Sequence, residues 1–221
     1  MRYWALIYRD VETEPQSVKN TIRKKRKQAP PSLQGQFLIA MPNMPDKRFA
    51  RSVIYMFEHS PQSAMGLILN QRADHISFQG LLEHLKLFEG KKSGAMPARI
   101  QHMDVHVGGP VDAGRGFVLH SADYRNKDAT LVVDDEISMT ATVDILRALA
   151  RGQGPDRALL ALGYAGWGAG QLENEMASNG WLHCTANADV IFDRDVDTKY
   201  ERALAILGIQ QTHLSSVAGH A

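Results

Sequence analysis

The chain alternates short apolar runs with polar loops, a pattern typical of a folded protein that contains many β-strands. Runs rich in β-branched and aromatic residues, each followed by proline, glycine or asparagine, predict buried strands. The first three lie close together at residues 37–41, 52–57 and 65–69, and they predict a meander at the start of a sheet. Further strands are expected at residues 105–107, 116–120, 131–133, 158–162 and 181–183, with a short apolar element at 190–192.

Apolar residues at helical spacing predict four helices among these strands. The first has an apolar stripe of Leu81, Leu82, Leu85 and Phe88 before Gly90, and the second has Ile145, Leu146 and Leu149 between a cap at Thr140 or Thr142 and Gly152. The third runs from Gln171 to Asn179 and Gly180. The fourth has Tyr200, Leu204 and Leu207 before Gly208. Because the strands come in runs with helices interspersed, the order favours the α+β class over a regular βαβ alternation.

The composition is that of an ordinary globular protein, and it excludes disulfide-rich, cysteine-rich zinc-binding and membrane-spanning proteins. Of the 221 residues, 44% are hydrophobic and 22% are charged, the usual balance of a folded domain. The single cysteine, Cys184, excludes an internal disulfide and a cysteine-rich zinc site. No apolar run approaches the length of about 18 residues that spans a bilayer, and Arg9 and Asp10 interrupt the apolar N-terminus. We therefore expect a cytoplasmic protein that has no membrane contact, cofactor or metal.

Charge is distributed unevenly along the chain. Residues 1–32 hold eight basic and three acidic side chains, a charge of +5, which leaves −4 for residues 33–221. Five basic residues are consecutive: Arg23, Lys24, Lys25, Arg26 and Lys27. We expect residues 1–33 to be a flexible basic extension ahead of a folded domain at 34–221. The extension can contact nucleic-acid phosphates without sequence preference, or it can be a solvated tail with no binding role.

The glycine-rich run at residues 163–171 is the strongest candidate binding feature. A strand followed by glycines and a helix start presents backbone N–H groups to an anion. Here Gly166, Gly168 and Gly170 would donate those N–H groups, and Gln171 would orient the ligand. The run lacks the ending of a phosphate-binding loop and the spacing of a dinucleotide fingerprint. The alternative is a tight turn whose glycines allow Trp167 to pack over a helix end.

The other candidate residues do not form a catalytic set. Glu58 and His59 pair a carboxylate with an imidazole, but neighbouring strand residues point to opposite faces, so a structural role with His59 bonded to backbone is preferred. His102 and His106 have a metal-ligand spacing only if they lie on a helix, and a strand is expected there. No G-x-S-x-G motif supplies a nucleophile. The remaining candidate binding residues are Asn70, Gly108, Gly109, Arg115 and His120.

Several of these segments resemble the YqgE/AlgH family of bacterial proteins. The matching segments are residues 35–42, 49–55, 58–59, 64–70, 108–111, 115–120, 161–173 and 217–221, in this order within 34–221. The resemblance implies a single α+β domain whose strands bend into a barrel-like mixed sheet flanked by helices, in a cytoplasmic bacterial protein without an assigned activity. Some members are labelled transcriptional regulators, although this chain has no helix-turn-helix signal. Members often carry a cysteine just before the Glu-His pair, where this chain has Phe57, so a thiol-based role at that position does not apply.

Three functional hypotheses remain open. The first is a non-enzymatic binding or regulatory protein, whose partner, another protein or a small anionic ligand, the sequence does not identify. The second is a domain that binds a small molecule or anion through the 163–171 turn, and that could also be an enzyme. The third is nucleic-acid contact through the basic residues 23–27.

Overall fold

A computed structural model describes residues 32–87 and 96–209, and the statements below concern these two ranges. The strands are β1 (Gln36–Ala40), β2 (Val53–His59), β3 (Ser63–Ile68), β4 (Val105–Val107), β5 (Val111–Ser121), β6 (Thr130–Val132), β7 (Ile137–Thr140), β8 (Ala158–Gly168) and β9 (Trp181–Thr185). The helices are η1, a 3-10 turn (Lys47–Phe49), α1 (Phe78–His84), α2 (Ala98–Gln101), α3 (Val143–Ala150), α4 (Gln171–Ala177), α5 (Ala188–Ile191) and α6 (Lys199–Ile206). The basic residues 23–27 and the segment 217–221 lie outside the described residues.

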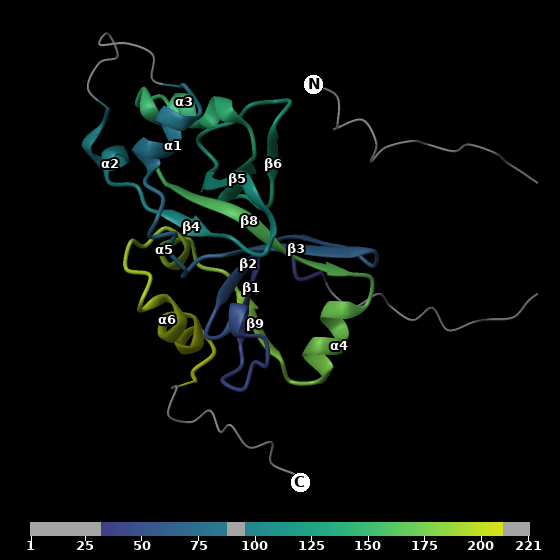
Figure 1. Cartoon of the computed structure of the whole chain (residues 1–221). Coiled ribbons are helices and arrows are strands. Elements are labelled where there is room, and N and C mark those ends of the chain that lie inside the picture. Colours follow the sequence, from purple (N-terminus) through teal and green to yellow (C-terminus); the bar gives the residue numbers. More distant parts are fainter. Residues whose placement is uncertain (1–31, 88–95, 210–221) are drawn as a thin grey trace, which may run out of the picture. The chain divides into compact units, whose positions relative to one another are not determined.

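All nine strands belong to one curled sheet with helices outside it (Figure 1). Eight strands follow the order β6-β7-β5-β8-β3-β2-β1-β9, and β4 pairs with β8 away from this path. The expected meander is present, because β1, β2 and β3 pair antiparallel in succession. The β4–β8 pair is parallel, so the sheet is mixed. The predicted α+β class and the barrel-like bending are therefore confirmed.

The meander is buried on both faces. Along β1, Phe37 and Ile39 pack into one apolar cluster, whereas Leu38 and Ala40 pack into a second cluster on the opposite face. Alternation of side chains along a strand separates the two sets. The unbroken apolar run in the sequence is explained by this two-sided burial.

None of the described helices is long and apolar enough to cross a lipid bilayer.

The glycine-rich run is not the turn that the sequence predicts, because β8 continues through it as far as Gly168. Residues 165–168 pair with Ser63–Gly66 of β3, and this pairing satisfies backbone groups that a turn would leave free. Gly163 lies at φ +70°, where β5 shifts its register on β8. Only Ala169 and Gly170 form a turn, and Gly170 adopts φ +72° to cap α4.

Other element boundaries also differ from the predictions. The first helix runs over Phe78–His84, and Leu85 beyond its end is 38% exposed, so the helix ends before the predicted Leu85. Phe88 and Gly90 of that prediction lie outside the described residues. The helix predicted around Ile145 is confirmed and is followed by Gly152 at φ +70°. Strand β7 and helix α2 were not predicted, because both are too short to show a period. Residues 190–192 belong to the end of α5 and its cap.

Two glycines predicted as binding residues are required by a close backbone crossing. The chain leaves β4 at Gly108 and passes directly over β8. A Cβ built on Gly108 would lie 2.3 Å from the Gly163 carbonyl oxygen, and one on Gly109 would lie 2.1 Å from the Tyr164 carbonyl carbon. The Gly108 N–H donates to the Leu162 carbonyl at 2.7 Å, so the crossing is hydrogen-bonded as well as tight.

We therefore expect Gly109→Ala to destabilise the domain by about 3 kcal/mol, because the backbone of β8 has no room to move away from the added methyl group. The measurement is urea unfolding followed by tryptophan fluorescence. Gly114→Ala is the matched control: it lies in β5 with no atom within 4 Å of the added Cβ, so it should change the stability by no more than about 0.5 kcal/mol. Equal stabilities of the two variants would contradict the prediction.

Candidate functional site

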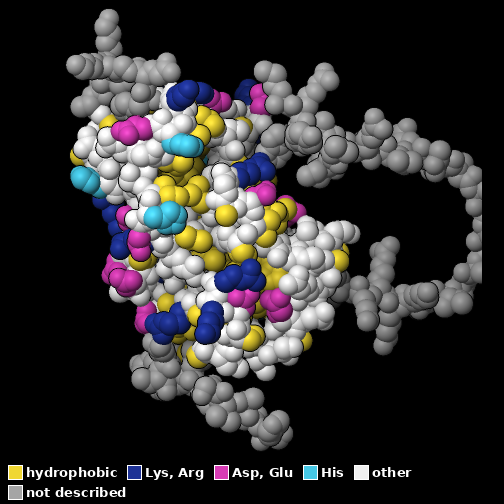
Figure 2. All heavy atoms as spheres, in the orientation of Figure 1, with side chains coloured by type: hydrophobic (Ala, Val, Ile, Leu, Met, Phe, Trp, Pro, Cys, Tyr) yellow, Lys and Arg dark blue, Asp and Glu magenta, His cyan; other side chains and the backbone are white. Residues whose placement is uncertain are grey.

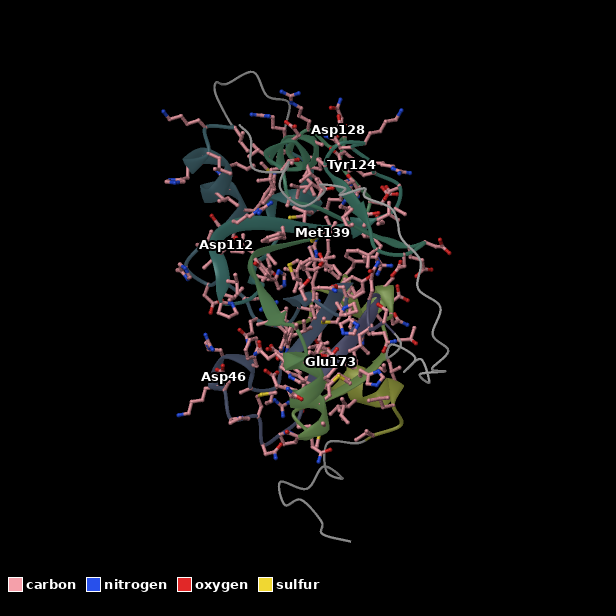
Figure 3. The ribbon with its side chains drawn as sticks, turned by 90° about the vertical axis from the view of Figure 1, so that its right-hand side faces the viewer. Asp46, Asp112, Tyr124, Asp128, Met139 and Glu173 are labelled. Atoms are coloured by element: carbon pink, nitrogen blue, oxygen red, sulfur yellow. The ribbon has the colours of Figure 1, made fainter. Side chains whose placement is uncertain are left out.

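Several predicted site residues gather at the end of the sheet where β2, β3 and α4 meet. His59 is the centre of this group: its Nδ1 accepts the Leu33 N–H at 3.0 Å, so Nε2 carries the hydrogen and donates to Glu173 Oε1 at 3.0 Å. The expected backbone hydrogen bond of His59 is thus present. Glu58 points elsewhere and accepts from the Ser63 hydroxyl at 3.1 Å, so the two neighbours do not act together. Glu173 lies on α4 (Figure 3).

Trp167 and Gln171 belong to a second set of contacts, centred on Glu175. The Glu175 carboxylate accepts from the indole N–H of Trp167 at 2.9 Å, from the indole of Trp181 at 2.8 Å and from the Gln171 amide at 2.9 Å. Gln171 Oε1 in turn accepts the Gly168 N–H at 3.2 Å. Each polar group is paired inside the protein, and the two indoles pack edge to face at 5.9 Å. The set holds α4 against the sheet.

This geometry favours a structural role for the 163–171 region over anion binding. The Gly168 N–H already has a partner, and Glu173 places a carboxylate in the first turn of α4. Gly166 is paired within the sheet, whereas Gly170 is exposed at the start of a seven-residue helix.

The remaining predicted residues are dispersed over the fold. Asn70 accepts the Val53 N–H and donates to the Arg51 carbonyl, both at 2.9 Å, and so ties β2 to the end of β3. His120 is fully buried between the Ser121 carbonyl at 2.8 Å and the Thr140 hydroxyl at 2.9 Å, and burial lowers its pKa. The Arg115 guanidinium lies over the Phe117 ring. The structure does not bring these residues together into one site.

A different group of residues forms a pocket of about 150 Å³ between α2, β4, the start of β8 and the end of α5. We call it the His106 pocket; its main lining residues are Arg99, His106, Arg157, Phe192, Asp193 and Arg194. Figure 1 shows α2, β4 and α5 next to one another. In Figure 2, basic and acidic side chains both lie along the left-hand side of the view.

His106 is the unusual member of the lining. The residue is only 6% exposed, and Nδ1 lies 3.2 Å from the Leu160 carbonyl oxygen. A carbonyl only accepts, so Nδ1 carries the hydrogen and Nε2 has a lone pair. Among the described residues, buried Nε2 has no hydrogen-bond partner. Burial, with a smaller effect of nearby Lys199, lowers the pKa of His106 to about 4, so the ring is neutral at pH 7.

Arginines surround this neutral ring, and each is fixed to the next segment of chain. Arg72 donates to the Arg194 carbonyl at 2.9 Å, Arg194 to the Arg99 carbonyl at 3.0 Å, and Arg99 to the Asp156 carbonyl at 2.8 Å. These hydrogen bonds link four separate segments of the chain beside the pocket. Arg157 completes the wall by stacking on Phe192, with 4.9 Å from the guanidinium carbon to the ring centre.

The acidic residues of the lining are already engaged by cations. Asp104 pairs with Arg72 at 3.3 Å, Asp156 with Arg99 at 3.7 Å, and Asp193 with Arg202. Arg157 pairs with Asp189 at 3.0 Å. Within the described ranges, Arg194 is the lining arginine that makes no ion pair with a carboxylate.

A second buried cation stands behind the pocket wall. Lys199 is fully buried and donates from Nζ to the Ile191 carbonyl at 2.6 Å. Burial lowers its pKa to about 8, against the opposing effect of Asp193, so it stays mainly protonated at pH 7. It makes no salt bridge with any carboxylate that the structure describes. Burying a charge is costly, and Asp193, which forms no salt bridge with Lys199, offsets only part of that cost.

Sequence reasoning missed this site because its members come from segments far apart in the chain. His106 was considered only as a metal ligand together with His102, and His102 is exposed and caps α2. Among the described residues no cluster of three or more His, Cys, Asp or Glu could hold a metal ion. The available signal was a histidine in the middle of an apolar Val-His-Val strand, where a polar side chain needs a partner.

Comparison with known proteins gives the family. Residues 37–212 match the sequence profile described as AlgH-like. The chain belongs to the AlgH-like family. Relatives in this family include a UPF0301 protein of Rhodopseudomonas palustris strain HaA2, 58% identical over 86% of this chain and 87% of the relative, and one of Bradyrhizobium diazoefficiens, 56% identical over 87% and 92%.

Two solved structures resemble this chain. The solution structure of the AlgH protein from Pseudomonas aeruginosa is 42% identical and covers 89% of this chain and all of that chain, with a TM-score of 0.68. The crystal structure of protein DIP2367 from Corynebacterium diphtheriae is 21% identical over 79% of this chain, with a TM-score of 0.58, and shows that the fold is shared.

The buried neutral state of His106 predicts a pH-dependent stability. The unfolded chain binds a proton near pH 6.5, whereas the folded protein resists it until about pH 4. The contribution of His106 is therefore complete above about pH 6.5 and is lost as the pH falls towards 4, an effect of about 3 kcal/mol. Urea unfolding between pH 7 and pH 4.5 measures it.

The variant His106→Gln should show a smaller fall in stability over this range than the wild type, because the buried titrating group is gone. His75→Gln is the matched control, since His75 is exposed and its loss should leave the wild-type slope unchanged. An identical pH dependence in wild type and His106→Gln would show that His106 protonates as readily in the folded as in the unfolded chain, against this prediction.

Proposed function

We propose that this AlgH-like protein is a binding protein without catalytic activity, and that its ligand is a small anion held in the His106 pocket. The observation that carries the proposal is the set of three arginines in the lining, of which Arg194 makes no ion pair with a described carboxylate, together with the buried cation Lys199 behind the wall. A ligand with an acidic group would supply the missing charge.

The size of the pocket limits the ligand. About 150 Å³ corresponds to about five water molecules of the liquid, and it is smaller than the roughly 300 Å³ at which drug-sized sites begin. A nucleotide or a flavin is too large to be enclosed in it. An inorganic oxyanion or a carboxylic acid of a few heavy atoms would fit.

The surroundings of His106 support binding more than catalysis. General acid–base catalysis needs a partner that donates or removes the second proton, and nucleophilic catalysis needs an activated hydroxyl, thiol or amine. No serine, threonine or cysteine lines the pocket, and the amine of Lys199 is fully buried behind its wall. The aspartates of the lining are engaged in ion pairs with arginines. We further propose that the protein works in the cytoplasm, where ligand binding serves a regulatory role through a protein partner.

Titration with small oxyanions tests this proposal. A ligand at ten times its Kd should stabilise the wild type by about 1.4 kcal/mol, measured as a rise in the thermal midpoint and confirmed by calorimetric titration. Arg194→Gln should weaken binding at least several-fold because it removes the lining cation that makes no ion pair with a described carboxylate. Arg147→Gln is the matched control: this exposed arginine lies on α3 and pairs with Asp144, away from the pocket lining. Equal affinities of the two variants, or no stabilisation of the wild type by any anion, would refute the proposal.

We also propose non-specific nucleic-acid contact through the basic residues 23–27, which rests on their five consecutive positive charges. Replacing all five by glutamine in the full chain should abolish binding of labelled duplex DNA in fluorescence anisotropy. Wild-type affinity should fall steeply with salt, since each neutralised phosphate releases counterions. If the glutamine variant still binds DNA, the basic run is not the contact. If the affinity of the wild type does not change with salt concentration, the contact is not with phosphates.

A further inference from the structure

The charge balance of the His106 pocket restricts its ligand to one negative charge. Three arginines and three aspartates line the pocket, and all three aspartates are engaged in ion pairs. Arg194 is the lining arginine that makes no ion pair with a described carboxylate. It donates to the Arg99 carbonyl at 3.0 Å, which leaves most of its five N–H groups without an acceptor among the described residues. Lys199 stands behind the wall and is not part of the lining, so a second negative charge would meet no further unpaired cation in the pocket.

Apolar side chains line the deeper part of the same pocket. Ile100 and Leu159 are each only 4% exposed, and Met103 and Phe192 are half-buried. The lining arginines are more accessible, with 42% of the Arg99 side chain and 40% of the Arg157 side chain exposed. The cations therefore lie nearer the mouth than the apolar groups do. A ligand that enters gains affinity by burying carbon, about fourfold for each methylene group, whereas an inorganic oxyanion has no carbon to bury.

We propose that the His106 pocket binds a short-chain aliphatic monocarboxylate in preference to inorganic dianions. This inference rests on the proposed anion binding and specifies its ligand. The two carboxylate oxygens match the planar guanidinium of Arg194 at the mouth, and the carbon tail lies among the apolar side chains of the lining. A volume of about 150 Å³ holds about five water-sized groups, so a tail of about two or three carbons fills it.

The experiment is calorimetric titration of the full-length wild type with acetate, propionate, butyrate and sulfate at pH 7 and one ionic strength. The three carboxylates have the same charge and differ only in the carbon that they can bury. Their affinities should rise about fourfold with each added methylene group, and butyrate should bind at least about tenfold more tightly than sulfate. Affinities that do not rise with chain length, or tighter binding of sulfate than of butyrate, would overturn this inference and leave the proposed function standing. Binding of none of the four would overturn both.

Two substitutions separate the charge from the apolar wall. Arg194→Gln should weaken acetate and butyrate by the same factor, because both ligands have the same carboxylate. Met103→Gln should leave the affinity for acetate near that of the wild type and reduce the butyrate-to-acetate ratio of affinities several-fold. Met176→Gln is the matched control: this half-buried methionine lies on α4 outside the pocket lining, so the ratio should not change.

Should Met103→Gln fail to fold, the wild type still decides through its methionine methyl resonances. The Met103 resonance should move further with butyrate than with acetate, and that of Met176 should stay in place with both. An unchanged ratio in a folded Met103→Gln variant, or a Met103 resonance that butyrate does not move, would contradict the placement of the tail.

Discussion

The close crossing of two backbones at Gly108–Gly109 and Gly163–Tyr164 is the constraint on which the rest of this fold depends. On the first half of β8, β4 pairs in parallel and β5 pairs antiparallel; on its second half, β3 joins the meander to it. The chain can leave β4 only by passing over β8, and side chains at the glycines would prevent this. The crossing holds β4 in place, and β4 carries His106 into the pocket.

The elements of the meander and α3 could be predicted from the sequence because their signals are local. Apolar runs with strong stops gave β1, β2 and β3, and the stripe at Ile145 with a following glycine gave α3. The glycine-rich run misled the prediction for a physical reason. Glycine favours turns locally, but pairing of residues 165–168 with β3 outweighs that preference.

The candidate site could not be predicted, because its chemistry arises from contacts across the chain. Glu58 and His59 are adjacent in sequence, yet they bind Ser63 and Glu173 on different elements. Arg99, His106 and Arg194 are far apart in sequence, yet they line one pocket. Residues adjacent on a strand point to opposite faces, so adjacency in sequence does not predict that their side chains share a site. A curled sheet brings distant loops together, so residues far apart in sequence can line the same pocket.

Two buried bases in one region are difficult to explain by stability alone. Apolar residues of similar volume would pack the space behind β4 without leaving Nε2 unpaired or burying the charge of Lys199. The Glu175 network shows how this fold treats polar groups that only hold it together: two indoles and an amide converge on one carboxylate, and each has a partner. The same treatment at His106 would pair Nε2 with a donor from the chain. Among the described residues no donor reaches Nε2, so the unpaired acceptor is a cost that this part of the fold carries and that the α4 contacts avoid.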